Sequence, residues 1–215
     1  MNNRLSGFGR VGALRLIPLC AGAFLLIGLA ACGKGGGGEE GVRLTPREII
    51  ARGWERFEAM DYAAALGDFE SAIGLNETLS DAWNGAGWSA GRVTGRLGEA
   101  EGYFAGCLQR DTTRYDALGG WAFVAYQLQN WTGAISKADS LLHRRPGWRF
   151  LHQPTVDFHD LRLMTAAAYY NLGDFETALD IIVTYLNPAF EADVSTPAGR
   201  RELLDEIERL RQVYG

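Results

Sequence analysis

One short motif in this chain has the residue types of a catalytic serine site. Gly87, Ser89 and Gly91 spell G-x-S-x-G, the pattern that places a nucleophilic serine on a sharp turn between a strand and a helix. Residues 80–86, which precede the motif, do not have the pattern of a strand. The turn needs that strand, so we expect no catalytic serine here.

The histidines are the second group that could do chemistry. His143, His152 and His159 are the three histidines of the chain, and Asp157 and Asp160 lie near them in sequence. Histidine and carboxylate groups together can bind zinc, but these spacings fit no standard ligand set. Together with the serine motif, this predicts a protein that has no metal site and no cofactor and is not an enzyme.

Composition and charge are those of an ordinary globular protein. The chain has 215 residues, 47% of them hydrophobic and 22% charged, which suits one domain or a short repeat array. The formal net charge is −5, and the first 31 residues hold three arginines and no acid, so the remainder carries −8. This acidic body argues against nucleic acid as a partner, because binding to phosphates needs a basic surface.

The first 31 residues have the composition of a targeting segment. Residues 1–15 are basic and contain no acid, and residues 16–31 are uncharged and mostly apolar. A basic stretch before a short apolar stretch is typical of a secretory signal peptide. The alternative is a retained membrane anchor, but the apolar run is shorter than the roughly 20 residues that a spanning helix needs.

The apolar run ends in Leu29, two alanines, Cys32 and Gly33. Small residues directly before a cysteine resemble the lipobox of bacterial lipoproteins. The resemblance implies cleavage before Cys32, a diacylglyceryl thioether on its sulfur and a third acyl chain on its new amine, and several chains anchor a protein stably to a bilayer. Because Gly33 is not aspartate, the resemblance also implies the outer membrane of the bacterial cell envelope, with the protein facing the periplasm.

The remaining cysteines and the glycines agree with this interpretation. Residues 33–41 are rich in glycine, so we expect the lipidated cysteine and a flexible tether over 32–44. Cys20 would leave with the signal peptide and Cys32 would be lipidated, so Cys107 has no partner for an internal disulfide. Cys107 lies in a helical pattern, where we expect a small buried packing residue.

From residue 45 onward the pattern is helical and repeats. Four segments align on an alanine that follows a large apolar residue by three positions. These alanines, Ala65, Ala100, Ala134 and Ala178, are 35, 34 and 44 residues apart. A fixed period of this length indicates a stack of similar helical units.

A spacing near 34 residues with two helices per unit resembles the tetratricopeptide repeat. Its small residue in the first helix matches as Gly53, Gly87, Ala122 and Ala166. The resemblance implies an all-α fold, a right-handed α-α superhelix of about four helix pairs over residues 45–215, with a C-terminal capping helix. Each unit leaves an apolar face that only its neighbour covers, so several must stack. The expected helices are 46–58, 62–74, 80–93, 97–109, 115–128, 131–143, 159–171 and 175–187.

A ninth helix is expected after Pro197, a residue that suits a first helical turn. Leu203, Ile207 and Leu210 form one apolar stripe, and the other positions are mostly charged. A single apolar stripe is what a terminal capping helix needs. The alternative is an amphipathic helix that binds a partner.

The 44-residue spacing places an insertion at residues 146–158, between the third and fourth pairs. Loops of this length are often functional. The alternative is an ordered connector that packs through Trp148, Phe150 and Phe158.

The resemblance also implies a binding groove, because the first helices of tetratricopeptide arrays line the concave face and recognise proteins or peptides. An aromatic stripe across adjacent units would form from Trp54, Trp88, Phe123, Tyr126 and Tyr170. Such exposed apolar surfaces often bind partners. Alternatively, these rings pack between neighbouring first helices or beneath the insertion. Carried over by alignment, the groove residues are Arg47, Trp54, Phe57, Asn84, Trp88, Arg92, Phe123, Tyr126, Gln127, Tyr170 and Asn171.

These features predict a membrane-anchored periplasmic lipoprotein that acts as a scaffold or adaptor in the cell envelope. Its partners would be a protein or peptide and, through acylated Cys32, a lipid bilayer. Binding of peptidoglycan or another glycan through the groove aromatics is one alternative, and a structural role in an envelope assembly is another. A glycan-processing enzyme is a further alternative by class only.

Overall fold

The computed structural model describes residues 44–214. The expected signal peptide, the lipidated Cys32 and all of the tether except residue 44 lie outside the described residues. None of the described helices is both long enough and apolar enough to cross a bilayer.

The described part of the chain is all-helical, as the sequence predicts. Most helices begin and end within one residue of the expected positions, because caps and turns mark their limits. They are α1 (Pro46–Glu58), α2 (Tyr62–Leu75), α3 (Ser80–Ala90), α4 (Leu97–Arg110), α5 (Tyr115–Gln127), α6 (Trp131–Arg144), α7 (Phe158–Leu172), α8 (Phe175–Ile181) with its π-helical continuation η1 (Ile182–Leu186), and α9 (Pro197–Tyr214).

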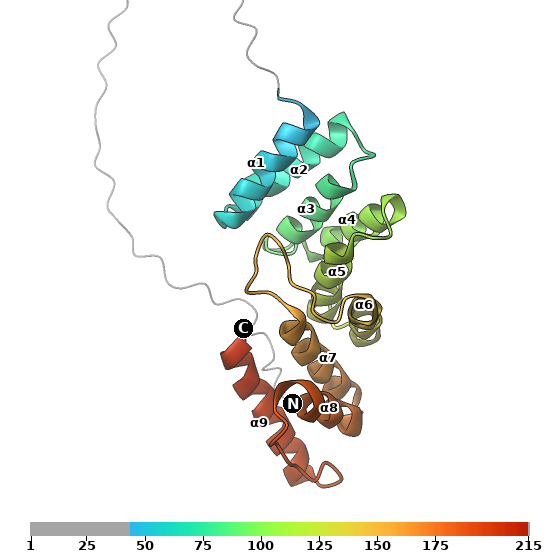
Figure 1. Cartoon of the computed structure of the whole chain (residues 1–215), viewed down its shortest axis with the longest axis vertical. Helices are drawn as coiled ribbons and strands as arrows, with labels where there is room; N and C mark the ends of the chain where they lie inside the picture. The colour runs from blue at the N-terminus through green and yellow to red at the C-terminus, as the bar shows by residue number, and fades with distance from the viewer. Residues whose placement is uncertain (1–43, 215) are drawn as a thin grey trace, which may run out of the picture. The chain divides into compact units, whose positions relative to one another are not determined.

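The helices pack as successive pairs, α1 with α2, α3 with α4, α5 with α6 and α7 with α8 (Figure 1). Each pair packs on the next, and each first helix also touches the first helix of the next pair. Contacts between successive second helices are weaker. We call the surface formed by α1, α3, α5 and α7 the inner face.

Glycines let the helices approach closely enough for aromatic rings to wedge between them. The Phe69 ring of α2 is fully buried between α1 and α3. A Cβ atom built on Gly85 of α3 would lie 2.3 Å from its Cζ atom. Phe104 of α4 has the same relation to Gly120 of α5, again at 2.3 Å. The alternation of small and large residues along the repeats therefore has a direct packing cause.

One helix boundary differs clearly from the expectation. The sequence pattern predicts that the third helix runs to residue 93, whereas α3 ends at Ala90. Gly91 follows directly, and Gly95 has a φ of 82°, a left-handed conformation that favours glycine. The chain therefore turns toward α4 one helical turn earlier than the apolar periodicity suggests.

The ninth helix caps the stack as predicted. Leu203, Ile207 and Leu210 are buried, and α9 packs against α7. Its last residue, Tyr214, stacks on His159 at the start of α7, with ring centroids 5.0 Å apart. Near its start, the guanidinium of Arg200 lies over the Phe175 ring just beyond the end of α7. The two helices therefore run antiparallel.

Candidate functional site

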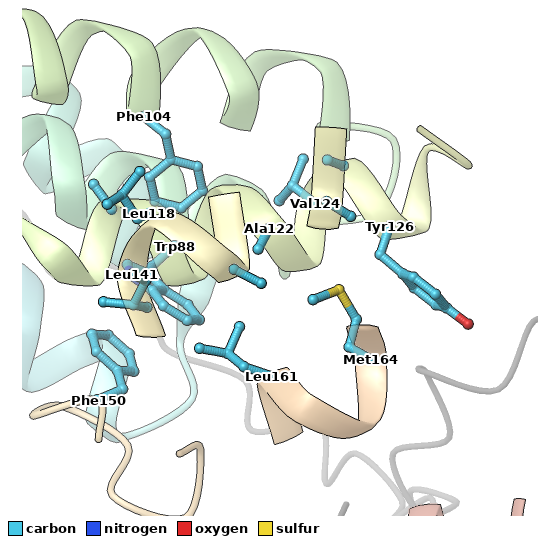
Figure 2. Packing of buried hydrophobic residues seen from close by; sticks show 14 of the residues in the cluster. Trp88, Phe104, Leu118, Ala122, Val124, Tyr126, Leu141, Phe150, Leu161 and Met164 are labelled. Atoms are coloured by element: carbon cyan, nitrogen blue, oxygen red, sulfur yellow. The ribbon is translucent and has the colours of Figure 1, made fainter. Parts of the chain in front are cut away.

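The inner face of the first two pairs is occupied by part of the insertion. We call residues 148–153 the insert segment. Phe150 is fully buried and stacks on Trp88 of α3, with ring centroids 4.0 Å apart and an interplanar angle of 12°. Figure 2 shows the two rings side by side. His152 stacks in the same way on Trp54 of α1, at 3.7 Å and 2°.

Hydrogen bonds hold the insert segment at both ends. His152 Nδ1 lies 2.9 Å from Glu58 Oε1 of α1, and Arg92 Nη2 donates to Gln153 Oε1 over 3.0 Å. At the other end, Trp148 Nε1 donates to Asp116 Oδ1 of α5 over 2.7 Å.

The backbone of the insertion closes on itself. Phe150 N–H donates to the Val156 carbonyl, and Phe158 N–H donates to the Trp148 carbonyl, each over 2.9 Å. Arg149 and Asp157 form an isolated antiparallel bridge. The insertion is thus a folded turn, and its arrangement matches the packed-connector alternative.

The inner face of the last two pairs faces α9. Burial raises the pKa of Tyr126 in α5, and the side chains of Arg211 from α9 and Asn171 from α7 oppose that shift. Burial also raises the pKa of Tyr170 in α7, and the charge of Arg200 from α9 opposes that shift. Residues predicted to point toward a groove partner therefore face a helix of the same chain.

The predicted groove aromatics do lie on the inner face, but most are covered. Trp54, Phe57, Trp88 and Tyr126 are buried, whereas Phe123 and Tyr170 are half-buried. Three members of the expected aromatic stripe are therefore not open, because the insert segment covers Trp54 and Trp88 and α9 faces Tyr126. Whether any of these rings binds a partner stays a prediction.

The tryptophans also connect successive pairs. Trp54 Nε1 of α1 donates to Asp81 Oδ2 in the first turn of α3 over 3.3 Å. Trp88 Nε1 of α3 donates to the Asp116 carbonyl in the first turn of α5 over 3.2 Å. A hydrogen bond from tryptophan to an aspartate thus recurs one repeat later, to the carboxylate of Asp81 and to the backbone of Asp116, so these rings serve the stacking of the units.

The polar groove candidates differ in accessibility. Arg47, Arg92 and Gln127 are exposed, and Asn171 is half-buried. Asn84 is buried, and its Oδ1 atom has no hydrogen-bond partner among the described residues. The exposed members of the predicted groove are therefore polar and include two arginines.

The serine motif is part of the helical packing. Ser89 lies inside α3, its side chain is fully buried, and no strand precedes it in the described chain. A Cβ on Gly87 would lie 2.6 Å from the Phe104 ring, so the motif's first glycine serves helix packing.

The histidines are separated in space and have structural contacts. His143 is exposed at the end of α6, and His152 stacks on Trp54. His159 Nδ1 lies 3.2 Å from Asp157 Oδ1. Over residues 44–214, no group of three or more histidine, cysteine or acidic side chains could hold a metal ion. Burial raises the pKa of Cys107 to about 12, which fits a packing residue and not a reactive thiol.

One feature escaped the sequence analysis. A cavity of about 620 Å³ lies where α5 begins and α6 ends, and its lining includes Arg114, Arg144, Arg145 and Arg149. The sequence feature that could have indicated this cavity is the adjacent pair Arg144 and Arg145 before Pro146. The repeat period does not show that residues 113–116 come to the same place.

Comparisons with known proteins show a likeness in fold. No family model matches the chain, and no curated protein matches it. A crystal structure of the MamA protein has 12% identity, covers 79% of this chain and 89% of its own, with a TM-score of 0.57. A tetratricopeptide repeat protein from Parabacteroides merdae has 17% identity over 79% of this chain and 61% of its own, with a TM-score of 0.54.

A third solved structure, YrrB, is described as a TPR protein with an unusual peptide-binding site. It has 18% identity, covers 76% of this chain and 85% of its own, and has a TM-score of 0.56. At such identities the likeness shows the fold alone. Residues 44–214 thus form a tetratricopeptide-like superhelix of helix pairs.

Proposed function

We propose that this protein is a scaffold that binds a protein or peptide, held at the bacterial cell envelope by a lipidated Cys32. The observation that carries the proposal is the insert segment itself. The inner face already holds a short chain segment, with Phe150 and His152 stacked on Trp88 and Trp54. A surface that accommodates one such segment has the chemistry to accommodate a partner's.

Two routes for a partner are consistent with this arrangement. A partner could contact the exposed polar residues Arg47, Arg92 and Gln127 with the insert segment in place. It could also displace the insert segment and take over its contacts with Trp54 and Trp88. The second route costs the stacking and hydrogen bonds that hold the segment, so it needs a partner with comparable aromatic groups.

The experiment is a pull-down with the full chain from detergent-solubilised membranes. Recovery of the same specific proteins by the unchanged chain supports the scaffold, and an Arg47→Gln/Arg92→Gln variant should lose part of that binding. A Glu202→Gln variant is the matched surface control. Co-sedimentation with purified sacculi and no protein partner would favour glycan binding instead and contradict the proposal.

The envelope anchor has its own support and its own test. The boundary of small residues before Cys32 follows a basic and then an apolar stretch, and stable anchoring needs more than one acyl chain. A Cys32→Ser variant should remain an unprocessed precursor that no longer incorporates labelled fatty acid. The sorting to the outer membrane, facing the periplasm, is tested by membrane fractionation. Unchanged labelling of the variant would rule out the lipid on this cysteine.

A further inference from the structure

The cavity beside the start of α5 lies outside the aromatic contacts of the inner face. Its walls come from residues 113–116, from the end of α6 and from the first residues of the insertion. Four arginines line it, against a single carboxylate, Asp116. This is a strong local excess of positive charge in a body whose net charge is −8.

The four arginines divide into two kinds. Arg114 pairs with Asp81 at 3.2 Å and Asp111 at 3.3 Å, and Arg149 lies 3.4 Å from Asp157. Neither Arg144 nor Arg145 has a carboxylate within ion-pair distance among residues 44–214. The first two arginines are therefore largely neutralised by the fold, and the second two are not.

Arg145 is held in place without using its hydrogen-bond donors. Its Cζ atom lies 4.9 Å from the centre of the Tyr115 ring, and such a contact uses the face of the guanidinium group. The N–H groups around its edge are left to bind an acceptor.

The remaining wall adds to the same field. Tyr115 begins α5, and no side chain caps that helix start, so the helix dipole there also favours an anion. Asp116 opposes an anion, but its carboxylate accepts the Trp148 Nε1 hydrogen bond.

We propose that this cavity binds a carboxylate group of an acidic peptide segment, with Arg144 and Arg145 as the recognising residues. The guanidinium fork matches a carboxylate through two parallel hydrogen bonds. A single side chain or chain end can reach the arginines of this open cavity of about 620 Å³, whereas an anionic membrane surface would meet the acidic body around it. The proposal deepens the scaffold function and rests on it, because it names the chemistry of one partner segment.

The test is a titration of the full chain in detergent with a fluorescein-labelled hexaglutamate peptide, followed by fluorescence anisotropy. Arg144→Gln/Arg145→Gln should weaken binding about tenfold or more, since each charged hydrogen bond contributes on the order of 1.5–3 kcal/mol. Binding should also weaken as salt rises from about 50 mM to about 500 mM. Hexaglutamine should not bind.

The matched control for Arg144→Gln is Arg201→Gln, which removes the same charge from an exposed arginine outside the cavity. This variant should bind the peptide as the unchanged chain does. Arg144→Gln alone guards against a folding defect, because its side chain has no ion pair or ring contact among the described residues. Circular dichroism should show that every variant keeps its helices.

Three outcomes would overturn the proposal. They are no binding by the unchanged chain, equal loss in the control variant, and displacement of the peptide by inorganic phosphate at a far lower concentration than by acetate. The last would assign the cavity to phosphate groups. If the titration fails while the pull-down still recovers specific proteins, the cavity proposal alone falls and the scaffold stands.

Discussion

The two halves of the inner face are covered by the same chain in different ways. Over α1 and α3 the cover is the insert segment, a short irregular stretch that contributes Phe150 and His152 to aromatic stacks. Over α7 the cover is α9, a complete helix of 18 residues that buries an aliphatic stripe. The first cover depends on a few ring contacts and hydrogen bonds, while the second has its own backbone hydrogen bonds.

This difference indicates which half can respond to a partner. Opening a short segment exposes two tryptophans and leaves the helix pairs packed. Removing α9 exposes the apolar side of the last pair, which a terminal unit of a solenoid needs to cover. We therefore expect the insert segment to open locally at a lower free energy than α9.

The largest expected effect comes from breaking the α9 cover. Leu203 is fully buried, so Leu203→Asp should place an unpaired charge in the core and destabilise the protein by about 3–5 kcal/mol. Urea unfolding followed by circular dichroism measures the change. Val213→Asp, at a position that is 60% exposed in the same helix, should stay within about 0.5 kcal/mol. Equal effects of the two changes would mean that α9 does not pack as described.

A smaller effect is expected from the insert segment. Phe150→Ala removes a fully buried ring, a change that costs about 3–5 kcal/mol in a rigid core. Here we expect about 2–3 kcal/mol, because the segment can open and limit the loss. Tryptophan fluorescence should shift to longer wavelength as Trp54 and Trp88 become hydrated.

The neighbouring position provides the control for this change. Leu151 is 74% exposed, so Leu151→Ala should change neither stability nor fluorescence appreciably. A full core penalty for Phe150→Ala without a fluorescence shift would show that the segment does not open, and would remove the contrast between the halves.

Substitutions at two glycines test the packing of the helix pairs beneath the insert segment. Gly85→Ala places a Cβ 2.3 Å from Phe69 Cζ, which should push α3 away and cost about 1–3 kcal/mol. A Cβ atom built on Gly102 of α4 would meet nothing within 4 Å, so Gly102→Ala should stabilise the helix by roughly 0.5–1 kcal/mol. Thermal unfolding measures both, and destabilisation by both would show that α4 is more crowded than described.

The smallest effect separates the halves by pH. The side chain of Arg209 lowers the pKa of Glu206 in α9 below 4.5, helped by Asn187. The stability that ionised Glu206 adds to the folded state is therefore present above pH 4.5 and is lost as pH falls through the lowered pKa. Burial raises the pKa of Asp116, which anchors the insert segment, above 3.8. The stability associated with protonated Asp116 is present below pH 3.8 and is lost as pH rises through the raised pKa.

Acid should thus weaken the α9 half and favour the insert half. Unfolding free energies measured from neutral pH down to about pH 3 for Glu206→Gln and Asp116→Asn check this. Relative to the unchanged chain, the first variant should lose less stability in acid and the second should lose more. The same pH dependence in both variants would contradict the opposite roles.

Much of the fold could be predicted from the sequence because its causes are local. Helix starts such as Thr45, whose capping box with Glu48 begins α1, depend on residues within one turn. The repeat period depends on contacts between adjacent units. One of these is the contact of the Phe69 ring with the backbone at Gly85. These features determined the helix pairs, the cap and the position of the insertion.

The accessibility of the inner face was decided only by the tertiary structure. His152 stacks on Trp54 and Phe150 on Trp88, and no local period links residues so far apart in the chain. The tertiary structure also decided the direction of α9, because an apolar stripe shows that a helix is buried but not which surface buries it. The arginine-lined cavity likewise forms only where two connections meet. Sequence patterns describe neighbours along the chain, whereas these sites depend on how distant segments return to a common surface.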